Sequence, residues 1–277
     1  MKKITFILLA AYTVLFPQEN RVNLRLPENI RLFADHLFCE KDYLRSAFEY
    51  ENYLSSGNND TISFKLGLAY QNLEEYDKSA GIFKSLFPRL NSRSEYFNSY
   101  FKKEDYENFR LLYSSSSTDL KEITSVKKLF LYSFLFSGNN IPSENEYQEV
   151  FNSDERIMSL FYERINLPNK NQLTAALLSA LVPGAGKIYT EQYGDGITAF
   201  IVTGLLSYLS YANFDAEHNF RGWLFGGLAA LFYAGNIYGS AASTHIYNAG
   251  VKINFEKELK LFLNNQNYFM PEYNFCR

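Results

Sequence analysis

Residues 66–86 read LGLAYQNLEEYDKSAGIFKSL, and this stretch predicts a pair of amphipathic helices with a short polar break between them. Apolar side chains on both sides of the break recur every three or four residues, which is the spacing of one helix face. The same pattern continues from about residue 24 to residue 168, where strand-like alternation is rare. We therefore predict an all-α fold for this part of the chain.

The helix pair is repeated in the sequence with a period of 33 residues. On its first helix, Gly67 lies between the larger residues Leu66 and Tyr70, so another helix can approach closely there. Stacked pairs need about three units to bury their apolar faces, so we expect further degenerate pairs at residues 96–113 and 126–151. The second helix carries Tyr43, Ser46, Ala47, Tyr50 and Tyr53 in one copy and Tyr76, Ser79, Ala80, Phe83 and Leu86 in the next.

These features resemble the tetratricopeptide-repeat family over about residues 27–91. The resemblance implies helix pairs that stack into a superhelix, whose concave wall binds extended or helical peptides of other proteins. We therefore expect residues 20–168 to form a helical-repeat domain that binds protein partners. The residues that carry the resemblance most directly are Leu66, Gly67, Tyr70, Tyr76, Ala80 and Phe83.

The first residues have the layout of a signal peptide. Lys2 and Lys3 precede an apolar run from Ile4 to Phe16, which is shorter than the about 20 residues that a spanning helix needs. No pair of small residues marks a cleavage site after this run, so residues 1–19 are either a cleaved signal or an N-terminal anchor. We place the chain at the cell membrane, with its repeats on the external or periplasmic side.

The composition changes between residues 171 and 250, which hold six charged residues and 11 of the 15 glycines. Two uncharged stretches, residues 196–214 and 222–251, are each long enough to cross about 30 Å of hydrocarbon. The short polar turn between them predicts a transmembrane helical hairpin. A soluble buried hairpin is the alternative, and we weigh it lower because uncharged stretches of this length are rare in soluble cores.

Small residues recur along the second uncharged stretch and predict close packing against another helix, either in the same hairpin or in a second subunit. They are Gly222, Gly226, Ala230, Gly235 and Gly239. Residues 251–277 follow as an amphipathic tail. We predict that the apolar face of residues 251–263 lies on the membrane surface.

An apolar half-helix at residues 173–182 precedes the turn motif LVPGAGKIY at residues 181–189. The pattern resembles the Pro-Gly-x-Gly-x-x-Tyr signature that heads small bacterial membrane hairpin domains of unknown function. The resemblance covers about residues 171–250 and implies an architecture without implying an activity. The motif residues are Pro183, Gly184, Gly186 and Tyr189, followed by Gly194 and Gly196.

The sequence contains no group of residues that predicts catalysis, a cofactor or a metal. Gly184, Gly186 and Lys187 do not have the spacing of a phosphate-binding loop. Cys39 and Cys276 are too few for a disulfide framework or a four-thiolate zinc site. The 27 basic and 30 acidic residues give a net charge of −3, which argues against a nucleic-acid partner.

We interpret the chain as a non-catalytic, membrane-anchored scaffold or adaptor whose repeats bind other envelope proteins. One alternative is an oligomeric component of an envelope transport or assembly machine, held together by the glycine-rich hairpin. Another is a membrane enzyme, which would use Lys187, Asp195 or His245. The predicted partners are therefore proteins or peptides, the lipid bilayer and, in the first alternative, further copies of the chain.

Overall fold

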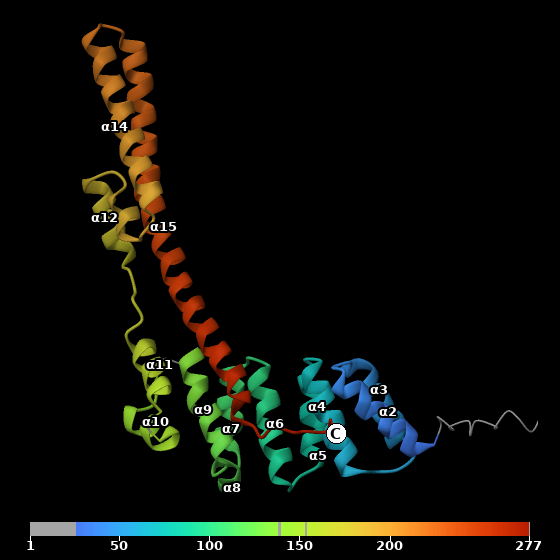
Figure 1. Cartoon of the computed structure of the whole chain (residues 1–277). Coiled ribbons are helices and arrows are strands. Elements are labelled where there is room, and N and C mark those ends of the chain that lie inside the picture. Colours follow the sequence, from blue (N-terminus) through green and yellow to red (C-terminus); the bar gives the residue numbers. More distant parts are fainter. Residues whose placement is uncertain (1–25, 138–139, 153, 277) are drawn as a thin grey trace, which may run out of the picture. The chain divides into compact units, whose positions relative to one another are not determined.

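The computed structural model describes residues 26–137, 140–152 and 154–276 (Figure 1). Every regular element within these ranges is a helix, which confirms the all-α prediction. The signal peptide predicted at residues 1–19 lies outside them. The chain divides into two compact units, residues 26–133 with 267–276, and Phe134–Gln266.

The first unit is built from consecutive short helices. From α2 to α6 each helix packs closely on the next, and α6 also contacts α7. The helices are α2 (Pro27–Cys39), α3 (Tyr43–Leu54), α4 (Asp60–Asn72), α5 (Tyr76–Ser85), α6 (Leu90–Lys102), α7 (Tyr106–Ser115), α8 (Thr118–Lys121) and most of α9 (Thr124–Phe136).

The same turn joins the two helices of each of the first three pairs. Lys41, Glu74 and Glu104 take up the left-handed conformation, each with φ of 62°. In the first two turns, the amide of the next residue donates to the carbonyl five residues earlier at 2.9 Å. This bond satisfies a carbonyl that the ending helix leaves free. The following helix begins in each case with a tyrosine, at Tyr43, Tyr76 and Tyr106.

Within these pairs, equivalent small residues face large rings. A Cβ atom added to Gly67 would lie 2.7 Å from Cε1 of Phe83, so the glycine gives the ring its space. The buried hydroxyl of Ser79 donates to the Gly67 carbonyl at 2.9 Å. One period earlier, Ser46 donates to the Ala34 carbonyl at 3.0 Å. The 33-residue repeat is therefore also a repeat of interhelical contacts.

In the second unit, α14 and α15 lie side by side and are joined by a short turn at residues 216–218. The helices α12 and α13 pack on α15 as well. The elements of this unit after α9 are α10 (Glu144–Phe151), α11 (Glu155–Ile165), α12 (Gln172–Leu181), α13 (Ala185–Tyr189), α14 (Tyr193–Asp215) and α15 (Asn219–Asn265).

The sequence predicts a separate tail after residue 250, whereas α15 continues through this position. It continues for 47 residues without a break, because residues 251–265 contain no proline or glycine. The apolar face of its last turns is buried in the protein, with Phe255, Leu259 and Leu263 each at most 2% exposed. These residues therefore do not lie on a membrane surface as predicted.

Among the described helices, α14 is the one that is long and apolar enough to cross a membrane. Only 6% of the residues in its most apolar 18-residue stretch are buried within the chain. The N-terminal half of α15, predicted as the second span, does not reach the same hydropathy, because its leucines and phenylalanines alternate with glycines, tyrosines and Asn236.

Candidate functional site

The last residues of the chain form an extended segment on the first unit (Figure 1). This tail, residues 267–276, begins with the short helix η1 (Asn267–Phe269), in which all three residues have positive φ. Left-handed backbone is unfavourable for residues with large side chains, so contacts must hold Tyr268 and Phe269 in place. After η1 the tail has no regular secondary structure through Cys276 and runs along the first unit (Figure 1).

Aromatic side chains of the tail pack on rings from successive helices. Phe275 lies against Phe38 of α2 with ring centroids 5.8 Å apart, and Tyr273 lies against Phe64 of α4 at 5.0 Å. Tyr268 meets Phe101 of α6 at 6.1 Å. These edge-on contacts are the geometry that aromatic pairs favour. The tail therefore crosses α6, α4 and α2 in the reverse of their order in the chain.

Lysine ammonium groups lie over three of the tail rings. The Nζ of Lys65 lies 4.7 Å from the centre of the Phe275 ring, and the Nζ of Lys102 lies 4.7 Å from that of Tyr268. Lys128 of α9 stands 5.3 Å above Phe269 in the same way. Each contact of this kind contributes about 0.5–2 kcal/mol. We call the surface formed by Phe38, Phe64, Lys65, Phe101, Lys102 and Lys128 the tail-binding face.

A disulfide between Cys39 and Cys276 fixes the end of the tail to the end of α2, with Cα atoms 5.6 Å apart. The bond is not among the features predicted from the sequence, where two cysteines were too few for a disulfide framework or a zinc site. The signal was present, since an exported chain with two cysteines enters a compartment in which they can pair.

Buried polar side chains lie beneath the tail. The carboxylate of Glu95, which is 1% exposed, accepts hydrogen bonds from Gln71 at 3.1 Å and from Asn98 at 2.9 Å. Burial lowers the pKa of Lys102, and the Glu95 charge opposes that shift. Burial raises the pKa of the Tyr273 phenol, and the negative charge of Glu95 raises it further. The Tyr273 phenol therefore stays neutral beside these buried groups.

A second polar cluster lies beside Phe275. The carboxylate of Asp35 accepts from Lys65 and from the hydroxyl of Tyr50, both at 2.7 Å, and from Arg31 at 3.0 Å. Burial raises the pKa of Tyr50, and its hydrogen bond to Asp35 acts in the same direction. Lys65 is thus positioned by Asp35 from one side while its ammonium covers the tail ring from the other.

Two cavities border the tail. One of about 510 Å³ is lined by Phe64, Arg89, Tyr273 and Phe275, among others. The other, of about 580 Å³, has Phe269 in its wall. The tail-binding face thus combines aromatic walls, cationic side chains and a buried carboxylate. This arrangement can hold an extended aromatic peptide, and within the described residues no His, Cys, Asp or Glu cluster suited to a metal is present.

Most of the repeat-signature residues pack the helices of the first unit against one another. Leu66, Ala80 and Phe83 are buried, and Gly67 makes the close approach to Phe83 described above. Tyr70 is half-buried and donates a hydrogen bond to Glu51. Burial, together with that carboxylate, raises the pKa of Tyr70 to about 12. Tyr76 begins α5 and is half-buried.

The glycines of the turn motif pack backbone against backbone. A Cβ atom on Gly184, which has φ of 88°, would lie 2.0 Å from the Gly196 carbonyl oxygen. A Cβ atom on Gly186 would lie 2.0 Å from the Ala175 carbonyl oxygen. Gly194 meets nothing within 4 Å, so this position does not require a glycine. Pro183 lies in the turn between α12 and α13.

Hydroxyl groups fasten this motif to α15. Ser179 accepts from the Gly186 amide at 2.9 Å and is 2.6 Å from the Ser240 hydroxyl. Thr190 is 2.7 Å from the Ser243 hydroxyl. The Tyr189 hydroxyl accepts from the amide of Asn171 at 3.2 Å, which ties it to the start of α12. Small residues and hydroxyls are the usual means of joining helices in lipid.

The predicted packing glycines divide between two environments. A Cβ atom on Gly222 would meet the Phe214 ring at 2.7 Å, and one on Gly226 would meet the Ser210 hydroxyl at 3.0 Å. Phe214 and Ser210 both belong to α14 of the same chain. Ala230 is exposed and Gly235 has open space around it, whereas Gly239 faces Lys187. The close approach predicted for this stripe is therefore made, in part, within the chain.

No family model, no curated protein and no solved structure matches the chain.

Proposed function

We propose that this protein is a membrane-anchored helical-repeat adaptor whose tail-binding face binds extended aromatic segments of other envelope proteins. The binding of the chain's own tail is the observation that carries the proposal. These contacts support the proposal, because three tail rings pack edge-on against Phe38, Phe64 and Phe101, and lysine ammonium groups lie over two of them. In this proposal the tail is an internal competitor for the partner.

The repeated helix pairs support the adaptor part of the proposal. The three pairs share one turn geometry, and the contact between positions 67 and 83 follows the register of the tetratricopeptide-like repeat. Stacked repeats of this type commonly provide extended binding surfaces. The face crossed by the tail is such a surface, since it draws residues from α2, α4, α6 and α9.

The composition of α14 and the first half of α15 supports the membrane anchor. Large apolar side chains such as Phe200, Leu205, Leu231 and Phe232 are more than half exposed, and water would make that exposure costly. In a bilayer the same side chains face lipid. We propose that the two helices cross the membrane together as a hairpin.

The disulfide supports a location outside the cytoplasm. Disulfides form and persist in extracellular and periplasmic compartments and are rare where thiols are kept reduced. The bond between Cys39 and Cys276 belongs to the first unit. We therefore propose that this unit faces the external or periplasmic side, as the N-terminal signal layout suggests.

A peptide-exchange experiment tests the adaptor proposal. The probe is a labelled synthetic peptide, NYFMPEYNFSR, which copies residues 267–277 with serine in place of Cys276. We expect it to bind the purified full chain that carries Cys39→Ser and Cys276→Ser, measured by fluorescence anisotropy in detergent. The oxidised wild type should not bind, because its own tail is held in place.

Substitutions on the face and away from it sharpen this test. Phe64→Ala should weaken peptide binding about tenfold, since it removes the ring that contacts Tyr273. Phe48→Ala is the matched control, because Phe48 lies exposed on α3 and is 65% accessible. Absence of peptide binding after release of the tail would mean that the tail is a fixed structural part, and the adaptor proposal would fail.

A further inference from the structure

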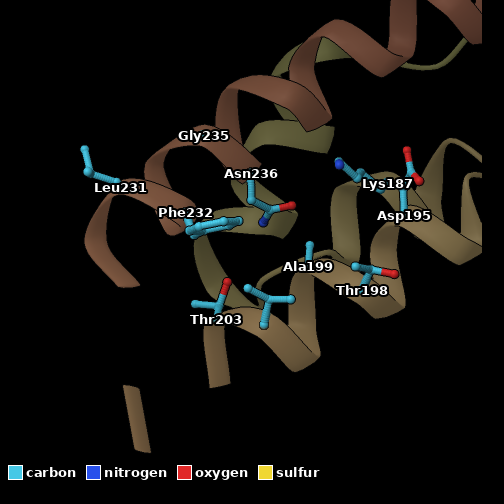
Figure 2. A pocket seen from close by; sticks show the side chains of 10 residues that line it. Lys187, Asp195, Thr198, Ala199, Thr203, Leu231, Phe232, Gly235 and Asn236 are labelled. Atoms are coloured by element: carbon cyan, nitrogen blue, oxygen red, sulfur yellow. The ribbon is translucent and has the colours of Figure 1, made fainter. Parts of the chain in front are cut away.

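A pocket with both apolar and polar side chains in its lining lies between α13, α14 and the middle of α15, within the segment that we propose to be membrane-embedded. Its volume is about 470 Å³, in the range of small-molecule sites. Figure 2 shows the Asn236 amide reaching from α15 toward α14, with Lys187 and Asp195 toward one end and Leu231 toward the other. The pocket therefore has a charged end and an apolar end.

Asn236 is the central feature of this pocket. Its side chain is only 6% exposed, and within the described residues no protein group bonds to either its Nδ2 or its Oδ1. The hydroxyl oxygen of Thr203, on the facing side, is likewise buried and without a protein partner. Buried amides and hydroxyls are normally paired, because leaving them unpaired costs free energy. These two groups therefore point to a ligand with polar atoms.

The position of Asn236 on α15 is not explained by helix packing. Gly222, Ala229, Asn236 and Ser243 recur every seven residues, which keeps them on one face, and all four are buried. The other three are small, as close helix contact requires. An alanine at position 236 would continue this run of small residues, whereas an asparagine adds two unpaired polar atoms. Intramembrane polar residues of this kind mark ligand sites.

The charged end of the pocket presents one cation and one anion. Lys187 is half-buried and Asp195 is exposed, and among the described residues neither forms an ion pair within 4.0 Å. Asp195 lies at the start of α14, and Thr203 is eight residues further along, about 12 Å deeper. The lining is thus charged at one end, carries an amide and a hydroxyl in the middle, and becomes apolar at Phe232. This change takes place over about the length of a lipid headgroup and its glycerol.

We propose that this pocket binds a single phospholipid whose headgroup carries both a phosphate and an ammonium group. The phosphate pairs with Lys187 and the ammonium with Asp195. The ester oxygens accept hydrogen bonds from Asn236 Nδ2 and from the Thr203 hydroxyl. One acyl chain lies along Phe232. An anionic headgroup that lacks the ammonium would leave the Asp195 carboxylate without a cationic partner. The site therefore discriminates against anionic phospholipids. This inference rests on the membrane anchor in the proposed function.

Lipid retention by the purified full chain tests the site. Membranes with equal amounts of ethanolamine and glycerol phospholipids are dissolved in mild detergent, and the lipid that stays bound is identified by native mass spectrometry. We expect one ethanolamine phospholipid per chain. Asp195→Asn should reduce the preference for ethanolamine over glycerol phospholipid about tenfold. Asp215→Asn, the same change at the opposite end of α14, should leave it unaltered.

Asn236→Leu provides a second variant whose effect does not depend on loss of folding. Leucine removes two unpaired buried atoms, so we expect the melting temperature in detergent to stay the same or rise while lipid retention falls. Retention of both lipids in their bulk ratio by the wild type would overturn the inference. A dimer that dissociates on Asn236→Leu, with lipid retention unchanged, would overturn it in favour of pairing with a second copy.

Two further arms separate the sources of failure. Soluble phosphoethanolamine is added in place of lipid, and binding of this compound at the affinity of the intact phospholipid would overturn the lipid assignment. Extraction of the chain from membranes by alkaline carbonate would refute the membrane anchor and the lipid site together. Resistance to extraction without any lipid preference would refute the lipid site alone.

Discussion

Cys39 at the end of α2 and Cys276 in the tail are joined by a disulfide across 237 residues of sequence. The bond keeps the tail on the first unit, because the end of the extended segment cannot leave α2 while the bond is intact. Contacts of Tyr268, Tyr273 and Phe275 then form at high effective concentration. The covalent bond and the aromatic contacts therefore stabilise the same docked state.

We expect Cys276→Ser to lower the free energy of unfolding of the first unit by about 2–4 kcal/mol, because the unfolded chain loses its constraint. Chymotrypsin should then cleave the tail after Tyr268 or Phe269, which mass spectrometry of the fragments would reveal. Cys39→Ser should have the same effect, and the double variant should show no further loss, since all three lack one bond. Equal protease resistance of wild type and variants would contradict this prediction.

The buried phenol of Tyr273 predicts that stability falls at alkaline pH. Its pKa is raised in the folded state by burial and by Glu95, whereas an unfolded tyrosine titrates near 10. The stabilisation from the neutral phenol is therefore fully present below about pH 10 and is lost as the pH rises toward the folded pKa. Each pH unit above 10 costs up to about 1.4 kcal/mol for this group.

Tyr273→Phe isolates this contribution. Urea unfolding at pH 8 and pH 11 should show a smaller loss for the variant than for wild type, by about 1 kcal/mol. Other tyrosines, such as Tyr50, also have raised pKa values, so only the difference between the two proteins is diagnostic. An identical loss in both would mean that Tyr273 ionises as freely in the folded chain as in the unfolded one.

The helix pairs of the first unit could be predicted from the sequence because their contacts are local. Apolar spacing identified the helices, and the 33-residue register placed Gly67 and Phe83 in the same pair. The docking of the tail could not be predicted in this way. Tyr273 meets Phe64 across more than 200 residues, and neither periodicity nor composition reports which distant rings will meet.

The small residues of α15 illustrate a different limit. A step of four residues turns a helix about 40° past a full turn, so a stripe with that spacing drifts around the helix. Because of this rotation Ala230 lies at an exposed position, whereas its neighbour Ala229 is buried on the packed face. A seven-residue spacing drifts only about 20° the other way. The packed face therefore includes Asn236, which a search for small residues alone overlooks.

Gly67→Ala tests the contact that the repeat predicts. The added methyl group would lie 2.7 Å from Phe83 Cε1, so the ring must shift in a packed core. We expect a loss of about 1–3 kcal/mol in the free energy of unfolding, measured by urea denaturation. Gly81→Ala on α5 is the matched control. It has open space, and the better helix propensity of alanine should stabilise by up to about 1 kcal/mol.

The outcome of this pair separates crowding from helix propensity. If Gly67→Ala proved as stabilising as Gly81→Ala, the Phe83 ring would have to accommodate a methyl group without cost. The close approach at position 67 would then be incidental to the repeat. A loss at position 67 with a gain at position 81 would show that the two helices of the pair need this glycine for contact.

The turn motif of the second unit makes a similar prediction with a larger effect. A methyl group on Gly186 would lie 2.0 Å from the Ala175 carbonyl oxygen, which is backbone and cannot move aside as a side chain can. Gly186→Ala must therefore separate α12 from α13, and it should break the bond between the Gly186 amide and Ser179. We expect a loss of 3 kcal/mol or more, at the upper end of the about 1–3 kcal/mol typical of overpacking.

Gly194→Ala is the matched change in the same motif, because nothing lies within 4 Å of the added methyl group at the start of α14. Thermal unfolding in detergent, followed by circular dichroism, should give a much lower midpoint for Gly186→Ala and an unchanged or higher one for Gly194→Ala. Equal midpoints would mean that α12 is not held against α13 by the glycine backbone. The resemblance to a Pro-Gly-x-Gly turn would then have no structural basis at Gly186, whereas a large difference would assign the motif to helix contact.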